Sequence, residues 1–306
     1  MEVLRYPFMQ RALLAAVLTG LMAPAIGTYI VQRRLSLLGD GLGHVALAGV
    51  GLAFVTGLAP LPVAVVVAVA GAVVIELLRQ RGKATGDLGL AIVFYGGLAA
   101  GVLLTGLAGR GAATLSGYLF GALTTVSTED LVLVGILAAV VLVATVGLRA
   151  RLLAVSADED FAKTMGLRVS GYNLLVVVLA SITVTTAMRT VGLLLVSALM
   201  VVPVATAQNL FRSFGTGLFA AMGTGVAVAL LGVLGSHQLD VAPGALIVLL
   251  GIAVFAVSWP LSTWLHRRAR AVLPGAPAPG PRHDGEQRPA HPFPTVPADQ
   301  LAPGDH

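Results

Sequence analysis

Asp40 and His44 are the residues whose types and spacing best support chemistry in this sequence. They stand four positions apart in GDGLGHVALAGVGL, and helical residues at that spacing share a face with Cβ atoms about 5–6 Å apart. A carboxylate oxygen and an imidazole nitrogen on one face suit borderline divalent cations such as Zn²⁺ or Mn²⁺. A simple Asp–His hydrogen bond, or an Asp that caps a helix N-terminus, would explain the same pair without a metal. The spacing leaves these alternatives open.

A second distinctive segment, SADEDFAKTMGL at residues 156–167, places acids between long apolar runs. We expect Ser156 to cap a short helix whose acidic first turn, residues 158–160, complements the positive end of the helix. Gly166 is expected to end it. A short amphipathic helix at a membrane surface offers a binding surface to a partner protein. The alternative is a helix on the lipid surface, where anionic headgroups would repel its acids.

The composition indicates that membrane-spanning helices carry these residues. Of the 306 residues, 57% are hydrophobic and 11% are charged, whereas a soluble domain has about 25% charged residues. Apolar stretches of about 20 residues recur, the length that a helix needs to cross the hydrocarbon core. Barrel strands would alternate apolar and polar residues, and these stretches do not. We therefore predict an all-α, polytopic transmembrane helical bundle.

Eight or nine membrane helices are predicted within a domain over residues 1–270. The second is short and rich in glycine, so it could be a broken or partly inserted helix, although its glycines more simply predict close packing between helices. If Asp40 and His44 bind a metal ion, this site has few protein ligands and would bind the ion loosely enough to release it, as a conduit requires. The predicted spans are 11–31, 42–58, 61–79, 87–108, 130–148, 171–188, 190–210, 215–235 and 243–265.

Positive charge predicts which helix ends face the cytoplasm, because short loops rich in Lys and Arg stay on that side. Four basic clusters lie two spans apart and are assigned to the cytoplasm: residues 79–83, 149–168, Arg212 and 267–270. Arg33 and Arg34 also favour the cytoplasm, but so do Arg5 and Arg11 at the other end of the first span. The sequence leaves this conflict open.

The remaining polar residues are expected at span ends, in loops or in a tail. Glu76 should reach water from the end of its span, and Arg189 should lie in a loop. His237 and Asp240 should lie in an ordinary outer connection, the alternative being an entrance site that attracts cations. Residues 271–306 are rich in Pro and poor in apolar residues, so we predict a disordered cytoplasmic tail. Its scattered histidines have no chelating spacing.

Missing motifs narrow the class of function. The sequence has no cysteine, which excludes thiolate metal sites and cysteine catalysis. It has no GxxxxGK[ST] phosphate loop, so ATP hydrolysis would require a separate subunit. It has no HExxH or GxSxG motif, so an enzyme is not expected. Its basic residues lie in short clusters between apolar runs, a pattern that indicates topology and no nucleic-acid binding.

The stretch RALLAAVLTGLMAPAIGTYIVQRRLSLLGDGLGHVALAGVGLA resembles the opening of the zinc/manganese branch of ABC importer permeases, the metal-uptake permeases of type II ABC importers. Three further segments agree in the order of that family: SGYLFGALTTVS at 116–127, SADEDFAKTMGL, and VGLLLVSALMVVPVATAQNL at 191–210. The resemblance covers residues 8–265. Gly43 and Ala48 stand where Ser and Pro are usual in the family.

The resemblance implies roles for individual residues. Asp40 and His44 match the D-x-x-x-H segment of the family, which implies that they pass the metal ion. Pro203 is implied to break the seventh span near the pathway. The insert looks like the coupling helix that docks into the ATPase, and its implied coupling residues are Asp158, Glu159, Phe161, Ala162 and Gly166.

The resemblance also implies an assembly in the bacterial plasma (inner) membrane. It contains a homodimer of the permease, a cytoplasmic ABC ATPase dimer, an extracytoplasmic metal-binding protein and surrounding lipid. No permanent cofactor is expected, and the transported divalent ion would be Zn²⁺, Mn²⁺ or Fe²⁺. Alternatives are a siderophore or cobalamin permease, which needs no ion-ligating pair, and an ion-coupled secondary transporter in which Asp40 carries a proton. A structural or sensory subunit would show no flux.

Overall fold

The apolar runs form helices because backbone polar groups have no water partner in hydrocarbon and must bond within their own segment. The computed structural model describes residues 6–81, 86–110, 112–121, 127–189 and 191–272. The helices that correspond to the nine predicted spans are α1 (Pro7–Gln32), α2 (Leu38–Thr56), α3 (Pro60–Gln80), α4 (Gly86–Leu107), α6 (Thr128–Gly147), α9 (Val169–Ala187), α10 (Leu193–Leu210), α11 (Phe214–Leu239) and α12 (Pro243–Val272). The predicted all-α bundle is confirmed.

Seven of these helices are long and apolar enough to cross a membrane. The other two, α4 and α10, contain shorter apolar stretches at Ala91–Leu107 and Leu195–Leu210. The glycine-rich α2 is among the seven and is helical throughout its 19 residues. Its glycines therefore do not break the helix, contrary to one sequence-based expectation.

The chain divides into two compact units, Met1–Trp264 and Leu265–His306. The first contains the helical bundle. Of the second, the structure describes only the end of α12, and the tail predicted to be disordered lies outside the described residues from 273 onward. The membrane domain predicted to end at residue 270 thus extends a few residues past the first unit.

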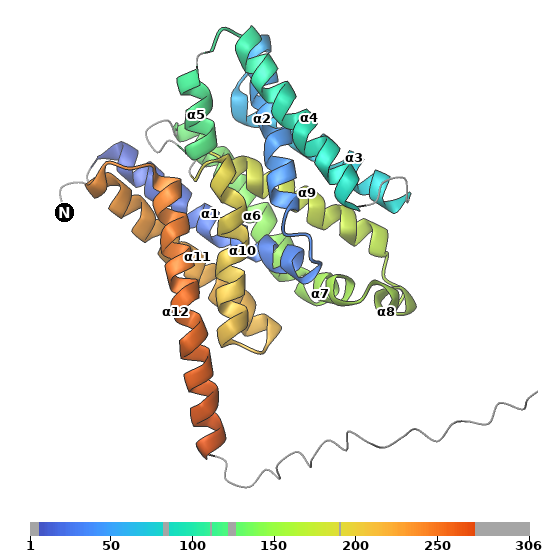
Figure 1. Ribbon diagram of the computed structural model, residues 1–306. Helices are drawn as coiled ribbons and strands as arrows, with labels where there is room; N and C mark the ends of the chain where they lie inside the picture. The colour runs from blue at the N-terminus through green and yellow to red at the C-terminus, as the bar shows by residue number, and fades with distance from the viewer. Residues whose placement is uncertain (1–5, 82–85, 111, 122–126, 190, 273–306) are drawn as a thin grey trace, which may run out of the picture. The chain divides into compact units, whose positions relative to one another are not determined.

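Within the first unit, α1 and α2 are the most buried of the seven long apolar helices, whereas α3, α6 and α12 are exposed. About seven-tenths of the apolar window is buried in α1 (72%) and α2 (67%), compared with 22–28% in the three outer helices. In Figure 1, α1 passes through the middle of the bundle, and it packs against α6, α9, α10 and α11. The exposed apolar faces of the outer helices suit contact with lipid or other subunits.

Glycines allow the closest helix crossings. A Cβ atom added to Gly20 of α1 would lie 2.8 Å from the carbonyl oxygen of Gly225 in α11. A Cβ atom added to Gly225 would lie 2.4 Å from the carbonyl oxygen of Gly20. Only residues without a side chain fit at this crossing, as is common where membrane helices approach closely.

Three shorter helices complete the described fold: α5 (Ala112–Phe120), α7 (Arg149–Ala157) and α8 (Glu159–Thr164). The nine residues of α5 reach about 14 Å, too short to cross a membrane. Gly192, with a φ of +92°, would place a Cβ atom 2.4 Å from the carbonyl carbon of Phe120, so the turn before α10 lies against the end of α5. The sequence did not predict α5 or α7 as helices.

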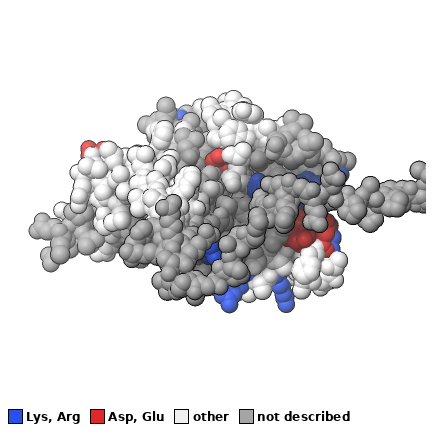
Figure 2. All heavy atoms as spheres, turned by 60° about the horizontal axis from the view of Figure 1, so that its bottom comes forward, with Lys and Arg blue, Asp and Glu red and all other residues white. Residues whose placement is uncertain are grey.

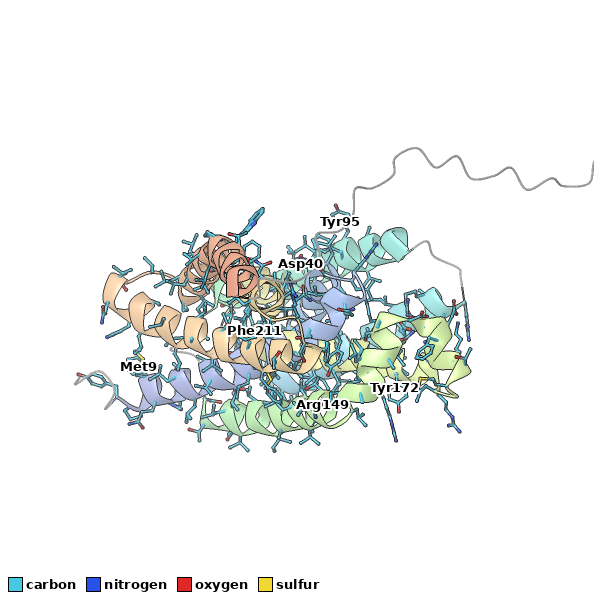
Figure 3. All side chains as sticks on the ribbon, turned by 90° about the horizontal axis from the view of Figure 1, so that it is seen from below. Met9, Asp40, Tyr95, Arg149, Tyr172 and Phe211 are labelled. Carbon is cyan, nitrogen blue, oxygen red and sulfur yellow. The ribbon has the colours of Figure 1, made fainter. Side chains whose placement is uncertain are left out.

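Contacts at the ends of α1 resolve the conflict among its arginines. Arg33, directly after α1, bonds to Glu159 of α8, whereas Arg11 donates to Thr128 at the start of α6. Met9 and Tyr172, near the starts of α1 and α9, lie toward opposite ends of the molecule in Figure 3. Arg33 therefore lies at the end that the sequence assigns to the cytoplasm, and Arg11 lies at the other end.

Candidate functional site

Asp40 and His44 lie one turn apart in the first half of α2, as the sequence predicted. The His44 side chain is buried, with a residue exposure of 5%. Its ring packs edge to face against Phe94 of α4 at a centroid distance of 4.2 Å. His44 Nδ1 is buried and has no hydrogen-bond partner. An unpartnered buried nitrogen is costly, so this imidazole is suited to an additional ligand.

The carboxylate of Asp40 is oriented by a neighbouring helix. Ser197 Oγ on α10 donates to Asp40 Oδ1 at 2.6 Å, a length typical of a charge-assisted hydrogen bond. A carboxylate accepts at two oxygens, so this bond leaves capacity for a cation. The sequence did not single out Ser197, because its partner lies 157 positions away.

The contacts at these atoms bear on the two metal-free explanations of the pair. Leu37, and not Asp40, is the N-cap residue of α2. Asp40 Oδ1 accepts from Ser197, and His44 Nδ1 lacks a partner. In Figure 3, Asp40 lies among the helices, whereas Tyr95 is at the edge of the molecule. The described residues contain no cluster of three or more His, Cys, Asp or Glu that could hold a metal ion.

Glycines of α2 bring its neighbours close to the pair. A Cβ atom on Gly39 would lie 2.7 Å from Ser197 Oγ, and one on Gly43 would lie 2.1 Å from Leu193 Cδ1. On α4, a Cβ atom on Gly97 would lie 2.8 Å from the backbone of His44. The expected packing role of the α2 glycines is confirmed, and it explains how α10 and α4 reach the pair.

Pro203 lies inside α10, and the helix continues on both sides of it. The expected break of the helix is therefore wrong at the level of secondary structure. Proline removes one backbone donor, but packed neighbours allow membrane helices to tolerate it. Pro203 is buried, and its role near a pathway stays a prediction.

The insert after α6 folds into α7 and α8 in place of the single predicted helix. Asp158 is the N-cap of α8, and its Oδ1 accepts from the backbone N–H groups of Asp160 and Phe161 at 3.0 and 2.9 Å. Ser156, the expected cap, lies within α7. Asp158 is the cap because its backbone is extended, which directs its carboxylate toward these donors. Gly166 follows α8 with a φ of +77°, as expected of a residue that ends a helix.

The five expected coupling residues play different structural roles. Asp158 and Gly166 shape the ends of α8, and Ala162 is fully buried. Only Phe161 presents a large exposed side chain, at 58%. Met165, which sequence reasoning missed, is 61% exposed beside it, so both apolar side chains are available to a partner. Figure 2 shows acidic and basic side chains gathered near this end of the molecule.

Glu159 faces the bundle and forms part of a polar cluster with Arg33, Glu76, Arg79 and Asn173. Glu76 is only 1% exposed and accepts from Arg79 Nε and Nη2, both at 2.9 Å. The expectation that Glu76 reaches water is therefore wrong, because a bidentate pair satisfies it in place. Burial and the neighbouring Arg79 lower the pKa of Arg33, while Glu159 raises it. The guanidinium remains protonated at neutral pH.

The opposite end of the molecule has its own polar contacts. Arg189, in the turn after α9 as expected, pairs with Asp130 at the start of α6 and lies 5.9 Å from the Tyr118 ring centroid. His237 lies within α11, and Asp240 is the C-cap of that helix. The outer connection predicted around them is thus shorter than expected.

Comparison with known proteins decides the class of this membrane protein. Residues 5–261 match the model of the ABC 3 transport family. The chain belongs to this family. It is 32% identical over 256 residues to the manganese import system permease protein ScaB of Streptococcus parasanguinis, over 83% of this chain and 91% of the relative. It is 35% identical over 281 residues to the manganese transport system membrane protein MntC of Halalkalibacterium halodurans, over 89% and 96%.

A solved structure supports the same assignment. PsaBC from Streptococcus pneumoniae, in complex with Fab, has a TM-score of 0.78 and 31% identity, and the match covers 87% of this chain and 97% of that chain. As an ABC 3 family member, this chain is a multi-pass permease of the bacterial plasma membrane. Membership in an ABC family argues against the alternative of an ion-coupled secondary transporter.

Proposed function

We propose that this permease imports divalent transition-metal ions, Mn²⁺ or Zn²⁺ and by the same chemistry Fe²⁺, with energy from a partner ATPase. The buried His44, whose Nδ1 lacks a partner one turn from the Asp40 carboxylate, carries the proposal. Imidazole nitrogen and carboxylate oxygen are the donors that these borderline cations share. The names of the ScaB and MntC relatives, which specify manganese, support the same class of cargo.

Weak binding suits the proposed pathway. Each chain would offer one acid and one imidazole, fewer ligands than the four of a structural zinc site. Two copies in a homodimer would supply two such pairs. An ion held this loosely can leave again, which a transport site requires. The ion is therefore cargo and not a resident cofactor.

The proposed partners follow from what the chain lacks and what it exposes. The sequence has no phosphate-binding loop, so a cytoplasmic ABC ATPase dimer would hydrolyse ATP. Phe161 and Met165 on and beside α8 would contact that ATPase, because they expose large apolar side chains at the end assigned to the cytoplasm. An extracytoplasmic metal-binding protein would deliver the ion to the opposite end.

Replacing His44 tests the pathway directly. His44→Ala removes one of the two proposed donors, and we expect uptake of ⁵⁴Mn or ⁶⁵Zn to fall by at least about tenfold, as is typical when a metal site is disturbed. The measurement is uptake by cells that express the chain with its partners, normalised to its amount in the membrane.

His237→Ala is the matched control, because His237 is exposed at the end of α11. It should transport like the unmodified protein. Unchanged uptake by His44→Ala at normal expression would remove the pathway role from this residue.

A further inference from the structure

Glu159, the first residue of α8, is held by side chains from three other parts of the bundle. Its Oε1 accepts from Arg33 Nη2 at 3.0 Å and from Asn173 Nδ2 of α9 at 2.9 Å. Arg79 Nη2 of α3 lies 3.9 Å from the same oxygen. Apart from its packing, α8 is thus joined by ion pairs to α3 and to the connection between α1 and α2, and by a hydrogen bond to α9.

The Arg33 side of this contact is deeply placed. The Arg33 side chain is 4% exposed, whereas the Glu159 side chain is 40% exposed. A buried guanidinium that loses its carboxylate is left with an uncompensated charge, so the position of Arg33 depends on Glu159. Arg79 is itself fixed by the buried Glu76, which keeps it available at the edge of the contact.

Two buried atoms next to the contact have no partner. Arg33 Nη1 is a donor and Asn173 Oδ1 is an acceptor, and both belong to side chains that already bind the same Glu159 oxygen. Each unsatisfied atom costs free energy. If α8 moved and withdrew Glu159, these two side chains could pair with each other, which would offset part of the loss. With these two alternative sets of partners, Arg33 and Asn173 could remain hydrogen-bonded in two different positions of α8.

The Arg33 end of the contact leads directly to the candidate metal site. Arg33 is the C-cap residue of α1, and α2 begins at Leu38. Arg34, with a φ of +59°, lies in this connection, and Leu35 N–H bonds back to Ile30 at 3.0 Å. A connection this short and hydrogen-bonded transmits displacement better than a flexible loop would. Asp40 lies in the first turn of α2.

We propose that Arg33 and Glu159 are positioning residues that link α8 to the start of α2, so that movement of α8 displaces Asp40. This inference rests on the proposed function, in which a partner ATPase engages α8. Glu159 thus acts inward, on the bundle, whereas the exposed Phe161 faces outward, toward the partner. Neither Arg33 nor Glu159 needs to touch the ion.

The test measures uptake and ATP hydrolysis separately. The permease is reconstituted with its ATPase in liposomes, and ⁵⁴Mn transported per ATP hydrolysed is recorded for Arg33→Gln, Glu159→Ala and the double variant. We expect each single variant to transport about tenfold less metal per ATP, while hydrolysis stays within about twofold. The double variant should lose no more than the worse single variant, because both changes break one contact.

Arg151→Gln is the matched control, since Arg151 is an exposed arginine of α7 that contacts Tyr172. It should keep the full ratio of metal to ATP. Arg33→Gln and Glu159→Ala variants that also keep this ratio, or losses that simply add in the double variant, would overturn the inference while leaving the proposed function intact. If Arg33→Gln does not fold, Glu159→Ala decides alone. Absence of uptake by the unmodified complex would instead refute the proposed function.

Discussion

At the scale of residues, the candidate site depends on contacts between helices as much as on the spacing within one. The i, i+4 relation of Asp40 and His44 was visible in the sequence and indicated one shared helix face. Ser197 and Phe94, which orient the carboxylate and the ring, come from helices that the sequence could not place beside α2. The sequence thus predicted the donor pair and missed the side chains that hold it.

Ser197→Ala should weaken transport without removing a ligand. Loss of its hydroxyl frees the Asp40 carboxylate to rotate, and outer contacts of this kind typically contribute about tenfold to metal affinity or activity. We therefore expect the KM for Mn²⁺ uptake to rise about tenfold, with less change in the maximal rate. The measurement is uptake over a range of Mn²⁺ concentrations.

Ser181→Ala provides the comparison for this prediction, because Ser181 is a fully buried serine that donates to the carbonyl of Val178 in its own helix. It should leave the KM unchanged. Equal KM values for the two variants would mean that Ser197 does not orient Asp40.

At the scale of elements, apolar length predicted each membrane helix, whereas short polar helices were mispredicted. The nine spans were recognisable because hydrocarbon requires long apolar segments to be helical. α7 has no such requirement, and its sequence RARLLAVSA resembles a polar connection. The cap of α8 is Asp158 instead of the predicted Ser156, since either of these nearby oxygen-bearing residues could cap a helix and the sequence alone does not fix the backbone angles.

Gly27→Ala tests whether close helix contact holds the bundle together. A Cβ atom at Gly27 of α1 would lie 2.1 Å from the Met200 carbonyl oxygen of α10, so the two helices must separate. Overpacking of this kind costs about 1–3 kcal/mol. We expect a lower thermal midpoint of the detergent-solubilised permease, measured by loss of its monodisperse peak after heating.

Gly135→Ala makes the same chemical change in α6, where nothing lies within 4 Å of the added atom. Alanine is the better helix former, so this variant should be at least as stable as the unmodified chain. A Gly27→Ala midpoint equal to that of Gly135→Ala would show that α1 and α10 are not in close contact.

At the scale of the whole molecule, the placement of Arg33 beside Glu159 puts the connection before α2 next to α8, at the end assigned to the cytoplasm. The rule that Lys and Arg stay on the cytoplasmic side assigned both ends of α1 to the cytoplasm, because it treats Arg11 and Arg33 alike. Contacts with residues far along the chain place these two arginines at opposite ends of the bundle, and local spacing in the sequence does not predict such contacts. The same limit hid the burial of Glu76, whose local partner Arg79 was visible while the helices around it were not.

Cysteine labelling tests the resulting topology without background, because the chain contains no cysteine. Leu58, 60% exposed between α2 and α3, is assigned to the outside, and the exposed Arg34 and Lys163 are assigned to the cytoplasm. A membrane-impermeant maleimide should therefore label Leu58→Cys in intact spheroplasts and label Arg34→Cys and Lys163→Cys only after permeabilisation. Labelling of Arg34→Cys in intact spheroplasts while Lys163→Cys stays protected would separate the first connection from α8. That result would be incompatible with the contact between Arg33 and Glu159, and so with any transmission from α8 to Asp40 through it.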